Sequence, residues 1–134
     1  MTENDLVLHA FELAAESGED ITERVHATFV AANPQSGELM DHMDEHMLGR
    51  MMEEVLTVLM APESSSQRSY LHFEVGSHKA YGVEKSMYLN FLAAVRDVIR
   101  TLLGSSWNQD FDAAWDDRMA SVLKEIDLAA AAAG

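Results

Sequence analysis

The chain has 134 residues, which suits one domain spanning 1–134, and its 23 acidic against 9 basic side chains give a net charge of −14. That charge repels nucleic-acid phosphates and anionic membranes, and the absence of cysteine excludes disulfides, thiolate metal sites and cysteine catalysis. No apolar run approaches the roughly 20 residues that cross a bilayer, and no leader pattern opens the chain, so we expect a cytoplasmic protein.

Two amphipathic helices are predicted in the first quarter of the chain. Apolar side chains recur at helical spacing from Leu6 until Gly18, which is typical of a helix end. Asp20 is then a candidate N-cap, and Glu23, three residues later, completes a capping box. Pro34 ends the second helix because proline disfavours the helical conformation of the residue before it.

The rest of the chain also follows helical periods. After a short polar stretch at 35–45, we predict helices at 47–59, about 67–79, 87–102 and about 108–132. Gly104 is a candidate left-handed C-cap for the helix that precedes it. No alternating strand pattern is present in the sequence. The predicted fold class is therefore all-α, with about six helices joined by short loops.

The segment with the most chemical content is Ser77-His78-Lys79-Ala80-Tyr81-Gly82-Val83. It places one histidine at the end of a predicted helix, directly before a Gly-Val turn and a long apolar helix. A helix end of this kind can present a single imidazole nitrogen to an iron atom in an apolar pocket. The alternative is a surface histidine, whose positive charge is favourable at a helix C-terminus.

The order of several motifs resembles that of single-domain bacterial globins, over most of the chain. The His78-x-x-x-Gly82-Val83 pattern is followed by Tyr88, and then by the pairs Leu103-Gly104 and Ala114-Trp115. Asn33-Pro34, with Phe29 upstream, is similar to the corner between the second and third globin helices. The resemblance implies a globin fold of six to eight helices in a three-over-three sandwich. It also implies haem b and reversible binding of oxygen, nitric oxide or carbon monoxide.

The resemblance assigns one histidine to each face of the haem. His78 takes the position of the proximal ligand to the iron. His26, eight residues before Pro34, takes a distal position on the second helix, where bacterial members often carry tyrosine. There it would donate a hydrogen bond to the bound gas, or ligate the iron itself. The other interpretation of His26 is a histidine packed between Arg24 and Phe29 at a helix crossing, and the residues alone leave both open.

The third predicted helix carries the expected distal gate. Aligning its apolar face with the family puts Met47 at the gate and Met51 one turn deeper. A shift of one residue would restore the usual histidine at the gate, as His46. We prefer Met47 because that shift would place Arg50 in the deep apolar position, where desolvating its charge is costly.

The remaining pocket residues follow from the same resemblance. Val83, Met87, Tyr88 and Phe91 would line the proximal floor, Met119 would reach in from the last helix, and Met40 would fill the place of a phenylalanine that usually wedges the haem. Two departures from the family pattern are evident. Glu74 lies where an apolar contact with the proximal ring is usual, and Ala130 replaces a glutamate that raises the basicity of the proximal histidine in bacterial relatives.

These features leave more than one function open. Without a flavin reductase domain, nitric oxide dioxygenase activity would be slow and would need an external reductase, and Ala130 argues against a peroxidase. The alternative is a non-haem globin-like module for regulation or protein interaction, which Met40, Met47 and Glu74 favour. His42 and His46, four residues apart, form a weaker candidate for an adventitious metal site. A homodimer also stays open.

Overall fold

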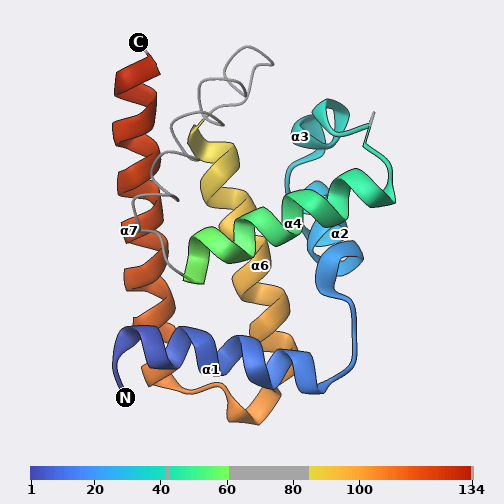
Figure 1. The fold of residues 1–134 in the computed structure, drawn as a ribbon. Coiled ribbons are helices and arrows are strands. Elements are labelled where there is room, and N and C mark those ends of the chain that lie inside the picture. Colours follow the sequence, from blue (N-terminus) through green and yellow to red (C-terminus); the bar gives the residue numbers. More distant parts are fainter. Residues whose placement is uncertain (42, 61–84, 134) are drawn as a thin grey trace.

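Helices account for most of the chain that the computed structural model describes, which is residues 1–41, 43–60 and 85–133. In chain order they are α1 (Glu3–Glu16), α2 (Ile21–Ala32), α3 (Pro34–Leu39), α4 (Glu45–Met60), α6 (Lys85–Leu103), the 3-10 helix η1 (Gly104–Ser106) and α7 (Gln109–Ala133) (Figure 1). These residues contain no strand, which confirms the all-α prediction. The helix predicted at about 67–79 lies outside the described residues.

Side-chain caps and one glycine set several helix ends. Thr2 and Asp5 form a reciprocal capping box on α1: Asp5 N–H donates to Thr2 Oγ1 at 3.1 Å, and Thr2 N–H donates to Asp5 Oδ2 at 3.0 Å. Asp20 is the N-cap of α2 as predicted, but its carboxylate accepts the N–H of Thr22, at 2.9 Å, and not that of Glu23, which the sequence offered for a capping box. Gly104 follows α6 with a φ of +54°, which is the left-handed conformation expected of a C-cap glycine.

The short helix α3 lies mostly in the stretch at 35–45 that the sequence marks only as short and polar, and it follows the Asn33-Pro34 corner on which the globin resemblance draws. Pro34 stands at its first helical position, where the fixed φ of proline suits a helix and the missing N–H is not needed. The same proline therefore ends α2 and begins α3. The two helices pack closely, because a Cβ added to Gly37 would lie only 2.8 Å from Val30 Cγ1.

The described helices stack in two layers (Figure 1). α6 and α7 run antiparallel, and α2 packs on α6. α1 lies across one end of this pair and packs on both α7 and α6. α4 crosses between α2 and α7, and it packs on both of them and on α1. Within the described ranges, no helix has the length and apolar character needed to cross a membrane.

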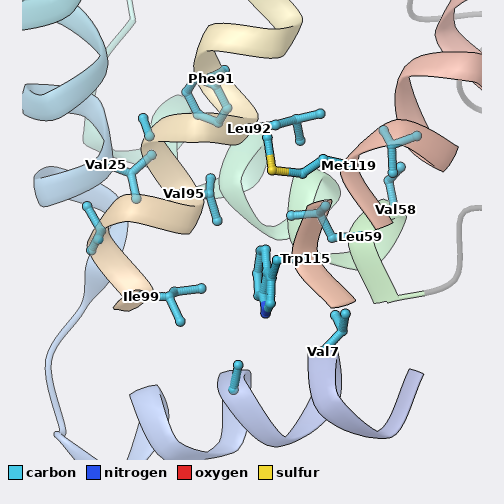
Figure 2. Packing of buried hydrophobic residues seen from close by; sticks show 14 of the residues in the cluster. Val7, Val25, Val58, Leu59, Phe91, Leu92, Val95, Ile99, Trp115 and Met119 are labelled. Atoms are coloured by element: carbon cyan, nitrogen blue, oxygen red, sulfur yellow. The ribbon is translucent and has the colours of Figure 1, made fainter. Parts of the chain in front are cut away.

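A continuous apolar core lies between these layers, with Trp115 of α7 near its centre (Figure 2). Trp115 is fully buried, as are Val7 of α1 and Leu59 of α4. Phe29 and Phe91 join α2 to α6 in an edge-to-face contact, with ring centroids 5.2 Å apart. Burying side chains of this size stabilises the fold by roughly 1.5–3 kcal/mol each. The apolar faces of all the longer helices thus pack together in one core.

One cation is buried beside this core. Arg118 of α7 is only 5% exposed. Its Nη1 donates to the carbonyl oxygens of Leu59 at 2.7 Å and Met60 at 3.1 Å, the last two residues of α4. Its Nε donates to Glu3 Oε2 at 2.9 Å, and its Nη2 donates to Asn4 Oδ1 at 3.2 Å. A single side chain therefore joins three helices.

Candidate functional site

The residues expected around the haem are distributed over α2, α3, α4, α6 and α7. His26 lies on α2, Met47 and Met51 on α4, Met87, Tyr88 and Phe91 on α6, and Met119 on α7, while Met40 is the C-cap residue of α3. His78 and Val83 lie outside the described residues, as do Glu74 and His42. α2 packs on α3, α4 and α6, so the helices that carry the expected distal residues are neighbours.

His26 carries the clearest chemical signal in this region. Its side chain is half-buried, and its Nδ1 atom is buried with no hydrogen-bond partner among the described residues. An unsatisfied buried polar atom costs roughly 1–3 kcal/mol, so such atoms are few in native proteins and call for an explanation. Arg24, which the sequence offers as a neighbour, forms a surface ion pair with Glu19 at 3.1 Å instead.

The methionines of α4 differ in how far they are buried. Met47 is 40% exposed, Met51 is half-buried against the core, and Met52 is only 3% exposed. Arg50 is exposed. His46, the other candidate for the gate, is exposed as well. Arg50, His46 and Met47 are thus all exposed, and Met47 as the distal gate stays a prediction.

The corner between α2 and α3 is held by an asparagine pair that the sequence reasoning missed. Asn33 Nδ2 donates to the Phe29 carbonyl at 3.0 Å, and Asn33 Oδ1 accepts a hydrogen bond from Asn90 Nδ2 of α6 at 2.7 Å. The two asparagines are 57 residues apart, and no local pattern links them. They fix the corner that positions Met40, whose side chain is half-buried against the core.

The α6 and α7 residues divide between the core and its margin. Phe91 is 9% exposed and Met119 is 5% exposed, so both are core residues, and Met119 points from α7 toward α6 (Figure 2). Met87 and Tyr88 are half-buried at the start of α6, and Tyr88 packs against the core cluster. Tyr88 and Met87 are therefore the α6 residues that lie at the boundary where a ligand could meet the core.

The ionisable groups of the described region form no metal centre. No set of three His, Asp or Glu side chains within residues 1–41, 43–60 and 85–133 is placed to hold a metal ion. The pKa of Asp5 is lowered by the hydrogen bonds from the Thr2 backbone and then its side chain, and that of Asp20 by the corresponding bonds from Thr22. Asp5 is the N3 residue of the α1 capping box and Asp20 is the N-cap of α2, so both pKa shifts arise from helix capping.

A separate open cleft of about 360 Å³ lies between the start of α1 and the first turns of α7. Its walls are Met1, Glu3, Leu6, Asp110, Ala113, Ala114 and Asp117. None of the residues expected to contact haem is among them. Glu3 is already paired with Arg118, so the cleft is a surface feature next to that ion pair.

Comparison of the chain with protein-family models and with curated protein sequences gives no match. The functional assignment therefore depends on the residues and geometry described above.

Proposed function

We propose that this chain is a cytoplasmic haem protein of globin type that binds oxygen or another diatomic gas reversibly. The observation that carries the proposal is the buried Nδ1 of His26, which has no hydrogen-bond partner in the described ranges. That atom lies on α2, the helix to which the globin resemblance assigns the distal side of the haem. An unsatisfied buried imidazole nitrogen is unfavourable in ordinary apolar packing, whereas in a ligand pocket it could pair with a polar ligand.

The arrangement of helices supports a globin fold as the finer description. α1 and α4 lie in one layer, and α2, α6 and α7 lie in the other (Figure 1). A three-over-three sandwich needs one more helix in the first layer. The sequence predicts a further helix at about 67–79, with His78 at its end, in the part of the chain that is not described. Globin helices cross at inclined angles around their pocket, as α1 and α4 do over the α6–α7 pair.

The residues present suit a haem group by their chemistry. When bound, haem would supply an iron atom with a coordination position for a small gas. His78 would hold the iron, and His26 is the imidazole available to donate a hydrogen bond to a polar ligand on the opposite side. Met40, Met51 and Phe91 would exclude water. Met47, a flexible thioether at the outer end of the α4 face, would let ligands pass.

A visible spectrum tests this proposal. The full chain is produced with added haem, and its absorption is recorded in the reduced state before and after adding carbon monoxide. We expect a Soret band that sharpens and shifts with carbon monoxide, and we expect His78→Ala to abolish or weaken it. The matched control is His9→Ala, because the His9 side chain is 43% exposed on α1 and stacks on Phe111.

The possible results separate the parts of the proposal. If native protein takes up no haem, the gas-binding function is wrong, and the non-haem helical module becomes the better description. If His78→Ala keeps the native five-coordinate ferrous spectrum, the protein is still a haem protein, but His78 is not its ligand. A loss of the band in His9→Ala as well would point to general unfolding, which circular dichroism of both variants resolves.

A further inference from the structure

Both tryptophans of the chain belong to one aromatic cluster where α1, η1 and α7 meet. Trp115 is 0% exposed, and its ring centroid is 6.2 Å from that of Trp107, with the planes tilted by 47°. Phe11 contacts the other side of Trp115 edge-on at 5.2 Å. Trp107 is half-buried and stacks on Phe111 at 5.5 Å. The two indoles therefore form a direct path from the centre of the core to its margin.

The two indole N–H groups have opposite environments. Trp107 Nε1 donates to Asp112 Oδ1 at 2.6 Å, and Asp112 is exposed to solvent. Trp115 Nε1 is buried and has no hydrogen-bond partner among the described residues. A buried tryptophan usually finds a partner for its N–H, and an exception in a well-packed core calls for a reason. The Trp107 indole N–H thus has a proton acceptor, whereas the Trp115 indole N–H has none within the part of the chain that is described.

We propose that Trp115 and Trp107 form a one-electron relay that carries an oxidising equivalent from the core to the surface, where Asp112 accepts the proton. The contrast between the two N–H groups gives the relay its direction. Removing an electron makes an indole N–H strongly acidic. No described residue accepts this proton from the Trp115 radical cation, while the Trp107 radical cation has a carboxylate in hydrogen-bond contact.

The steps balance in electrons and protons. A one-electron oxidant, such as a radical derived from peroxide, takes one electron from Trp115 and is itself reduced. Trp107 then transfers one electron to the Trp115 radical cation, which returns to the neutral indole. The Nε1 proton of Trp107 passes to Asp112, leaving a neutral indolyl radical and a carboxylic acid. A thiol or ascorbate in solvent restores Trp107 by supplying one electron and one proton, and Asp112 releases its proton to water.

The relay would protect a core that contains oxidisable sulfur. Met119 lies one helical turn from Trp115 on α7, and both face the same core cluster (Figure 2). Oxidation of such a thioether makes an apolar side chain polar and disrupts packing. The inference depends on the indole geometry alone and not on haem. If the relay is wrong, the proposed gas-binding function can still be right. If the gas-binding function is wrong, the relay can still be right.

Laser photoionisation of the full chain tests the relay. Transient absorption distinguishes the indole radical cation from the neutral indolyl radical, so the conversion can be followed in native protein, Trp107→Phe, Trp115→Phe and Asp112→Asn. We expect more radical cation to be converted into neutral indolyl radical in native protein than in Trp107→Phe and Trp115→Phe added together. Asp112→Asn should slow it by roughly 10²-fold, the order of effect of a positioned proton acceptor.

A second readout avoids dependence on Trp115→Phe, which alters the core. After exposure to a photochemical one-electron oxidant, peptide mass spectrometry locates the covalent oxidation products. We expect them at Trp107 in native protein and at Trp115 in Trp107→Phe. Every tyrosine is kept in both proteins, so quenching by tyrosine cannot produce the difference. The relay is wrong if the conversion in native protein merely equals that of the two variants added together. It is also wrong if Trp115 is oxidised to the same extent in native protein and in Trp107→Phe.

Discussion

Arg118 and Glu3 are 115 residues apart in the chain, yet Arg118 Nε donates to Glu3 Oε2 at 2.9 Å and joins the last helix to the first. The arginine also donates to the last carbonyls of α4, where the chain leaves the described region. Arg118 is nearly fully buried, whereas 37% of the Glu3 side chain is exposed. The ion pair therefore matters mainly as one part of a hydrogen-bonded junction between α1, α4 and α7.

Replacing Arg118 by methionine should destabilise the protein strongly. The change leaves the Leu59 and Met60 carbonyls without their donor and removes the link to α1. We expect the free energy of unfolding to fall by roughly 2–4 kcal/mol, because unsatisfied buried groups and broken buried pairs are costly. Urea denaturation measures it. Arg100→Met, at an exposed site on α6, is the control and should change stability by less than about 0.5 kcal/mol. If Arg118→Met and Arg100→Met lower stability equally, the hydrogen bonds of Arg118 do not stabilise the junction.

Gly37→Ala and Gly49→Ala should have opposite effects. Alanine normally stabilises a helix relative to glycine by about 1 kcal/mol, and nothing lies within 4 Å of a Cβ at Gly49. At Gly37 the new Cβ would meet Val30 Cγ1 at 2.8 Å, and valine has little freedom to turn away. We expect Gly37→Ala to lose roughly 1–3 kcal/mol in thermal or urea unfolding. Adding Val30→Ala should recover part of that loss, and a stabilising Gly37→Ala would show that α3 does not pack on α2 this closely.

The cap at Asp20 should make stability depend on pH in the acid range. The pKa of Asp20 lies below its ordinary value of 3.8, first because the Thr22 backbone N–H donates to its carboxylate and then because the Thr22 side chain does. A lowered folded-state pKa gives a stabilising contribution that is complete above pH 3.8 and lost as pH falls through the lowered value. Asp20→Ala should cost about 1 kcal/mol near neutral pH.

The control for this cap is Asp20→Asn, which keeps an oxygen for the Thr22 N–H but cannot titrate. Its stability near neutral pH should stay close to native, since asparagine and aspartate cap helices about equally well. The stability difference between native protein and Asp20→Ala should shrink in acid, while that between Asp20→Asn and Asp20→Ala should not. If the unfolding free energies of all three proteins change with pH in parallel, the Asp20 carboxylate does not cause the pH dependence.

His26→Leu should speed the release of oxygen from the haem-loaded protein. Under the proposed function, leucine removes the imidazole donor while keeping an apolar side chain at the core edge. The loss of one hydrogen bond corresponds to roughly a tenfold faster dissociation. Stopped-flow measurement of the oxygen dissociation rate checks this. His9→Leu, at a half-exposed position on α1 outside the expected pocket, should leave the rate unchanged. An unchanged rate in His26→Leu would place His26 outside the pocket.

Much of the secondary structure can be predicted from sequence alone, because its causes are local. The helical period of apolar residues, the cap at Asp20 and the left-handed Gly104 each depend on a few neighbouring residues, and all three are present in the structure. α3 is missed because Pro34 ends one helix and begins another within the same few residues. Proline signals both events, and only packing against α2 shows that the second also occurs.

The sequence by itself determined the all-α class, the positions of most helices and the candidate histidines, because periodicity and residue chemistry act over short distances. Only the tertiary structure decided which polar atoms are satisfied. It gave Arg118 four acceptors from α1 and α4, joined Asn33 to Asn90, and left the buried Nδ1 of His26 and Nε1 of Trp115 without partners in the described region. Hydrogen bonds between distant segments depend on how helices pack, and packing is a property of the whole core.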